Sequence, residues 1–126
     1  MFSIDETRNA IAFTFSSSQR EVERVLQEYK PFMQKLGVTE LSEFNIVLRE
    51  LLINAIEHGN MNMVERRVTA RVEHLDNRRF KLTVEDEGSG FDHENLNMNP
   101  PEDPQNKRRR VAAPTNASAA EAQSAK

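Results

Sequence analysis

The sequence of 126 residues contains no cysteine, no tryptophan and only four glycines, of which Gly90 is the last. The absence of cysteine excludes disulfides, thiolate metal sites and cysteine nucleophiles, and it fits a reducing compartment. No apolar run approaches the ~20 residues that cross a bilayer, and the N-terminus lacks the basic-then-apolar pattern of a secretion signal. These absences predict a cytoplasmic protein without a membrane partner.

Positive charge is also scarce. Lys and Arg together number 17 against 20 Asp and Glu, which gives a net charge of −3. The one basic cluster is Lys107–Arg110, and a charge run of this kind is most simply a solvated surface. A nucleic-acid partner is therefore not expected.

Composition divides the chain near residue 97. Residues 1–96 carry a net charge of −5, whereas residues 97–126 carry +2 and include all but one of the five prolines. Seven of the 16 residues after Arg110 are alanine, which offers too little apolar surface to offset the entropy of ordering. We predict one domain over residues 1–96 and a proline-containing, then Ala/Ser-rich, largely disordered tail over residues 97–126.

Hydrophobic periodicity predicts the secondary structure of the domain. Alternating apolar residues indicate strands at 10–15, 68–72 and 80–84, and apolar residues at helical spacing indicate helices at 18–36 and 40–58. The last two strands flank a short turn and should form an antiparallel hairpin. The predicted fold class is α+β, a two-layer sandwich with helices on one face of a mostly antiparallel sheet.

The ends of the two helices also have sequence signals. Ser18 and Glu21 fit a capping box at the start of the first helix, and Gly37 should end it. Thr39 is the expected cap of the second helix, and Gly59 its end.

Two groups of polar residues are candidates for chemistry. Glu50, Asn54 and His58 follow one another at intervals of four on the second predicted helix, along the edge of its apolar stripe. Asp86 ends the last predicted strand and is followed by Gly88 and Gly90. Taken separately, the first group could be a solvated helix edge and the second a tight turn that requires glycine.

Together, the two groups resemble the motifs of the GHKL, or Bergerat-fold, ATP-binding family. The segment ELLINAIEHGN at 50–60 is similar to the family's N box, and DEGSGF at 86–91 is similar to its first glycine box. The resemblance covers about residues 10–96 and is closest to the anti-sigma-factor serine kinases. It implies a Bergerat-like domain that binds ATP and Mg²⁺.

The resemblance implies a role for each matching residue. Asn54 would offer its side-chain oxygen to Mg²⁺, and Glu50 would act as general base or orient the attacking nucleophile. Asp86 would accept a hydrogen bond from the adenine amino group, while Gly88 and Gly90 would let the backbone pass close to the nucleotide. His58 and Asn60 would flank the pocket, and Phe91 would pack beneath it.

The sequence departs from the family after residue 96. The second glycine box, whose backbone N–H groups bind phosphate at a helix N-terminus, and the strand beyond it have no counterpart, because the last 36 residues contain no glycine. Residues 100–105 resemble the loop that precedes the missing box. The absence of the last strand would leave an open sheet edge, and such an edge invites pairing with a second copy of the chain. A homodimer is therefore expected as a possible state, as the resemblance also implies.

Two functional hypotheses remain open at this point. The first is an ATP-dependent regulatory kinase that phosphorylates a serine or threonine of an antagonist protein and controls a sigma factor by partner switching. The second is a non-catalytic interaction module of the same fold, in which nucleotide binding is weakened or lost. A histidine-kinase ATPase module is a third and less favoured hypothesis, since the sequence shows no dimerisation helices or phosphoacceptor histidine.

Overall fold

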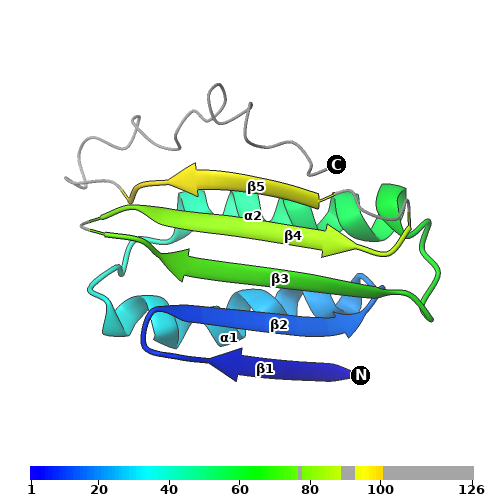
Figure 1. Cartoon of the computed structure of the whole chain (residues 1–126), viewed down its shortest axis with the longest axis horizontal. Coiled ribbons are helices and arrows are strands. Elements are labelled where there is room, and N and C mark those ends of the chain that lie inside the picture. Colours follow the sequence, from blue (N-terminus) through cyan, green and yellow to red (C-terminus); the bar gives the residue numbers. More distant parts are fainter. Residues whose placement is uncertain (77, 89–92, 101–126) are drawn as a thin grey trace.

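The computed structural model describes residues 1–76, 78–88 and 93–100. The strands are β1 (Phe2–Glu6), β2 (Ala10–Ser16), β3 (Arg67–His74), β4 (Phe80–Asp86) and β5 (His93–Met98). The helices are α1 (Arg20–Lys35), α2 (Ser42–Asn54) and a π-helix (Ala55–Gly59) that continues α2. All strand pairs are antiparallel, and their order in the sheet is their order in the chain, β1-β2-β3-β4-β5 (Figure 1).

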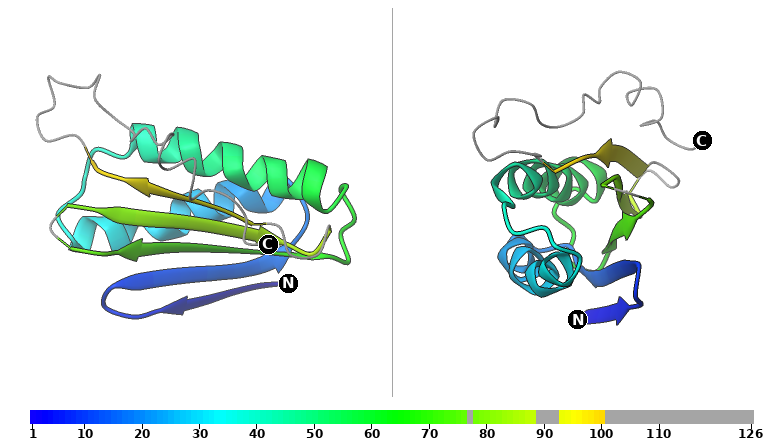
Figure 2. Two further views of the ribbon diagram at one scale, coloured as in Figure 1. Left: turned by 45° about the horizontal axis from the view of Figure 1, so that its top comes forward. Right: turned by 90° about the vertical axis from the view of Figure 1, so that its left-hand side faces the viewer.

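Both helices lie on one side of the sheet, as the right-hand view of Figure 2 shows. The strand register explains this arrangement, because Phe13, Ala70 and Val84 are paired across three strands and all three are buried toward the helices. Their neighbours in the strands alternate to the opposite, solvent-facing side of the sheet. The predicted α+β two-layer fold is confirmed.

The sheet is wider than the sequence pattern indicated. The alternating pattern did not reveal β1, which is largely exposed and contributes mainly Phe2, whose ring lies 5.9 Å from those of Phe13 and Phe15. Strand β5 extends to Met98, so the loop predicted to begin at residue 97 is wrong for its first two residues. Met98 is 1% exposed and belongs to the hydrophobic core. The rest of the predicted tail, from residue 101, lies outside the described residues.

The predicted helix caps are only partly correct. Gly37 ends α1 with a positive φ of 85°, as expected of a glycine after a helix. The capping box at Ser18 is wrong, because α1 begins one residue later, after Gln19, and Ser18 Oγ accepts only a long 3.4 Å bond from the Arg20 N–H. The cap at Thr39 is also wrong, since α2 begins at Ser42 and has no side-chain cap.

A change of helix type corrects the prediction of one α-helix over residues 40–58. Helix α2 ends at Asn54, and the chain continues as a π-helix in which the Asn60 N–H donates to the Ala55 carbonyl at 2.7 Å. A π-helix contains more residues per turn than an α-helix, and such segments are frequent at functional sites. His58 therefore does not continue the line of Glu50 and Asn54 at α-helical spacing.

A partly buried hydrogen bond joins the two long helices. The Tyr29 hydroxyl on α1 donates to the Asn45 Oδ1 on α2 at 2.5 Å, and Tyr29 is fully buried. Burial raises the pKa of Tyr29, because the phenolate would be poorly solvated in the core. The bond fixes how α1 and α2 sit together on the sheet.

The helices are short or amphipathic. Within the described ranges, none is long and apolar enough to cross a membrane.

Candidate functional site

The end of the N box lies directly against the turn that follows β4. A Cβ placed on Gly59 would lie 2.0 Å from Asp86 Oδ2, and a Cβ placed on Gly88 would lie 1.4 Å from the Gly59 carbonyl oxygen. At Gly88 the obstruction is backbone, so that position requires glycine, whereas a side chain at Gly59 would displace the Asp86 carboxylate. The structure therefore brings Gly59 together with Asp86 and Gly88, which lie 27 and 29 residues later in the chain; we call this the glycine junction.

The glycine junction also fixes the carboxylate of Asp86. The Gly88 N–H donates to Asp86 Oδ1 at 3.0 Å, and the other carboxylate oxygen, Oδ2, lies against the Gly59 Cα. Asp86 is half-buried at the end of β4. Its carboxylate is a hydrogen-bond acceptor held in one orientation.

The polar residues of α2 lie farther back along the same helical axis. Asn54 is the last residue of α2, five residues before Gly59, and Glu50 lies about one turn earlier. Both side chains are exposed. His58 is 77% exposed, and its Nε2 lies 4.0 Å from a Glu57 carboxylate oxygen.

Asn60, which was predicted to flank the pocket, is bonded to the residue that follows Asp86. Its side chain is fully buried and contacts three segments of the chain. Its Nδ2 donates to Ser17 Oγ at 3.1 Å and to the Arg67 carbonyl at 3.0 Å, and its Oδ1 accepts from the Glu87 N–H at 2.8 Å. Every polar atom of this buried amide has a partner, as buried polar groups generally require.

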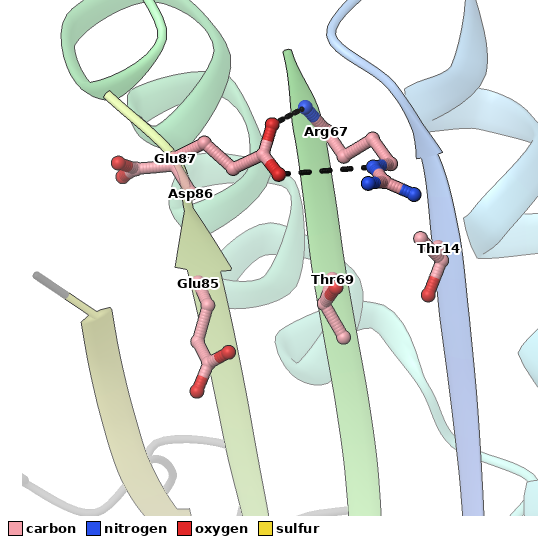
Figure 3. Close-up of a pocket in the computed structure, with 6 residues that line it drawn as sticks. All are labelled: Thr14, Arg67, Thr69, Glu85, Asp86 and Glu87. Atoms are coloured by element: carbon pink, nitrogen blue, oxygen red, sulfur yellow. Dashed lines mark hydrogen bonds and ion pairs between the residues drawn. The ribbon is translucent and has the colours of Figure 1, made fainter. Parts of the chain in front are cut away.

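Arg67 and Glu87 were not identified from the sequence. The Arg67 N–H donates to Glu87 Oε1 at 2.8 Å, and the Arg67 Nε lies 3.7 Å from Glu87 Oε2 (Figure 3). They lie at the start of β3 and just after the end of β4, which pair only in the folded sheet. The only nearby sequence signal is His-Gly-Asn at 58–60, and it indicates neither Arg67 nor Glu87.

A shallow polar depression of about 230 Å³ lies on the outer face of the sheet. It is lined by Thr14, Arg67, Thr69, Glu85, Asp86 and Glu87. In Figure 3, Thr14, Thr69 and Glu85 project from the face opposite the helices, whereas the Asp86 carboxylate points away from the Arg67–Glu87 pair. The depression therefore lies mainly on the face opposite α2 and shares Asp86 with the glycine junction.

The described residues supply only part of a site for ATP and magnesium. Asp86 fits a base with an exocyclic amino group, because it presents a fixed acceptor beside a backbone without side chains. No cluster of three or more His, Asp or Glu side chains that could hold a metal occurs in the described part of the chain. The exposed Asn54 oxygen suits Mg²⁺ only if phosphate and water complete its coordination, as they commonly do for this ion.

Three predicted features cannot be placed. Gly90 and Phe91 lie outside the described residues, as does the basic run Lys107–Arg110. Of the residues predicted for the phosphate side of the site, Glu50 and Asn54 are among those that the structure describes.

The fold and the glycine junction define a class of protein: a two-layer α+β domain in which the end of a helix meets a strand-end Asp-x-Gly turn. Comparison with known families gives the same class, since a family model for the histidine kinase-like ATPase domain matches residues 15–120. The chain belongs to this family, whose members share an ATP-binding domain. A search of curated proteins found none that matches the chain.

Proposed function

We propose that this protein binds Mg·ATP on the helix side of the sheet and acts as a regulatory serine/threonine kinase of the anti-sigma-factor type. The observation that carries the proposal is the glycine junction, which fixes the Asp86 carboxylate beside two residues that have no side chain. Membership of the ATPase-domain family and the N-box sequence support it.

Each proposed role matches the chemistry of the side chain that would perform it. Asp86 accepts a hydrogen bond from the adenine amino group, and Gly88 lets the turn after β4 pack against the Gly59 backbone. Asn54 holds Mg²⁺ through its amide oxygen, together with phosphate oxygens and water. Glu50, one turn before Asn54 on α2, acts as general base toward a hydroxyl nucleophile or orients it.

The kinase would act on a protein substrate. We propose that this partner is an antagonist protein, phosphorylated on serine or threonine, and that a sigma factor competes for the same regulator. A homodimer belongs to the same proposal. The edge beside β4, which the sequence left open, is paired with β5 in the described part of the sheet, so self-pairing would use the outer edge of β1 or β5.

The absence of glycine after Gly90 favours the second hypothesis, a non-catalytic interaction module. Loss of even one preorganised donor to a reacting group commonly costs ~100-fold or more in rate. In such a module the core and the glycine junction would persist, but ATP affinity would be too weak for the protein to bind ATP in the cell.

Calorimetric titration of ATP with variants of the proposed site tests the kinase hypothesis. Asp86→Asn keeps the size of the side chain but replaces a charged acceptor, and we expect ATP affinity to fall about tenfold or more, because hydrogen bonds to charged groups contribute ~1.5–3 kcal/mol. Asn54→Ala should remove the dependence of ATP affinity on Mg²⁺.

Glu85→Gln is the matched control for Asp86→Asn. Glu85 is the preceding residue and also a carboxylate, but it is exposed on the opposite face of the sheet. Its substitution should leave ATP affinity unchanged. Equal affinity in wild type, Asp86→Asn and Asn54→Ala would rule out this site, and a wild-type chain that does not bind ATP would favour the interaction module.

A further inference from the structure

Three residues form a closed ring of hydrogen bonds behind the glycine junction. The Asn60 Nδ2 donates to the Arg67 carbonyl, the Arg67 N–H donates to Glu87 Oε1, and the Glu87 N–H donates to Asn60 Oδ1, at 3.0, 2.8 and 2.8 Å. The ring joins the end of the N box, the first residue of β3 and the turn after β4. A fully satisfied polar network of this kind rigidifies the segments that it connects.

The π-helix explains how Asn60 reaches this position. The backbone N–H of Asn60 closes the π-turn on the Ala55 carbonyl at 2.7 Å, and a wider bond from the Asn62 N–H to the Ile56 carbonyl at 2.8 Å follows it. The same residue therefore ends the helix with its backbone and closes the ring with its side chain. Ser17, at the end of β2, supports the amide from the other side.

Only asparagine satisfies all the partners of this site. One edge of the side chain must donate, to the Arg67 carbonyl and Ser17 Oγ, and the other edge must accept from the Glu87 N–H. Aspartate would place an acceptor against the Arg67 carbonyl and bury a charge, and alanine would leave buried groups unsatisfied. The identity of residue 60 is therefore fixed by the ring rather than by contact with solvent or ligand.

The ring acts on Asp86 through the next peptide bond. The Glu87 N–H belongs to the peptide that joins Asp86 to Glu87, so its bond to Asn60 fixes that peptide plane. The Gly88 N–H then fixes the carboxylate itself, and Gly59 leaves it no space to turn toward the helix. The orientation of the base-binding acceptor thus depends on a residue that lies behind it.

We propose that Asn60 is a positioning residue that sets the base selectivity of the nucleotide site, without touching nucleotide, by holding the Asp86–Glu87 peptide. This inference rests on the proposed function. Adenine presents an amino group where guanine presents a carbonyl oxygen, so an acceptor in fixed orientation favours ATP over GTP. Loss of the ring would let the Asp86 turn shift and reduce that preference.

The test is the ratio of ATP to GTP affinity, measured by calorimetry at a temperature where each variant is folded. Asn60→Ala should lower the ratio of ATP to GTP affinity about tenfold or more. A loss of this size corresponds to the charge-assisted hydrogen bond from the adenine amino group to the Asp86 carboxylate. The ratio is informative because a purely structural defect lowers both affinities together and leaves it unchanged.

Ser17→Ala is the matched control. Ser17 is 1% exposed and also bonds the Asn60 amide, but it has no part in the ring. This variant should lose thermal stability as well and yet keep the wild-type ratio. An unchanged ratio in Asn60→Ala, or an equal fall in Ser17→Ala, would overturn the proposal.

Amide hydrogen exchange at Glu87 provides a second readout that needs neither a variant nor a nucleotide. In the wild-type chain the Glu87 amide should exchange as slowly as the amides of β4, because it is bonded inside the protein. Rapid exchange at Glu87 would refute the ring of hydrogen bonds even if ATP binds. Slow exchange in a chain that fails to bind ATP would instead support the ring and overturn the proposed function together with the selectivity.

Discussion

Gly88→Ala is expected to lower the free energy of unfolding by about 3 kcal/mol or more and to abolish ATP binding. The added methyl group would lie 1.4 Å from the Gly59 carbonyl oxygen and 2.3 Å from its carbon, and both are backbone atoms that cannot rotate away. Forced overpacking commonly costs ~1–3 kcal/mol, and an obstruction by backbone lies at the upper end of that range or above it. Chemical denaturation measures the stability, and calorimetry the binding.

Gly37→Ala provides the control for this substitution. Gly37 has a φ of +85° but nothing within 4 Å of an added Cβ, so alanine there meets only the backbone cost of a left-handed residue, about 1–2 kcal/mol. It lies between α1 and α2, away from the turn, and should leave ATP affinity unchanged. If the two variants lost equal stability and Gly88→Ala still bound ATP, the close packing of Gly88 against Gly59 would be wrong.

Met98→Ala is expected to destabilise the protein by about 2–5 kcal/mol, the usual range for truncation of a buried methionine. Met98 is 1% exposed, pairs with Phe80 in the β4–β5 ladder and packs in the core under the helices. The loss should appear as a lower midpoint in urea denaturation with little change in slope.

The neighbouring substitution, Asn97→Ala, separates burial from strand position. Asn97 pairs with Lys81 on the other face of the sheet, so its truncation should change stability by no more than about 0.5 kcal/mol. A Met98→Ala variant as stable as Asn97→Ala would show that β5 does not complete the core, and the domain would then end near residue 96, as the sequence predicted.

Local patterns were sufficient to predict most of the fold. Alternation of apolar residues in β2, β3 and β4 and helical spacing in α1 depend on which side chains face the core, which is visible in the sequence. The pattern did not reveal β1, because an exposed edge strand such as FSIDE buries little on either face. It also did not reveal β5, where prolines just beyond Met98 indicated a loop.

The candidate site was predictable in its parts but not in its assembly. The spacing of Glu50 and Asn54 and the Asp-x-Gly turn identified the residues, whereas the contact of Gly59 with Asp86 and Gly88 exists only after the helix packs on the sheet. The roles of Asn60, Arg67 and Glu87 depend on hydrogen bonds between segments as many as 27 residues apart. The change from α- to π-helix after Asn54 has no periodicity signal in five residues.

The central claim, that this chain is an ATP-binding domain, is tested most directly by the thermal melting of the unmodified 126-residue protein with and without Mg·ATP. A ligand that binds only the folded state must stabilise it, by about 2.7 kcal/mol at a hundred times its Kd, which corresponds to a rise of roughly 10 °C or more for a domain of this size. We predict a melting temperature that rises steadily with ATP concentration and rises less with GTP. A melting temperature that does not change at millimolar Mg·ATP would contradict ATP binding and would favour the hypothesis of a non-catalytic interaction module.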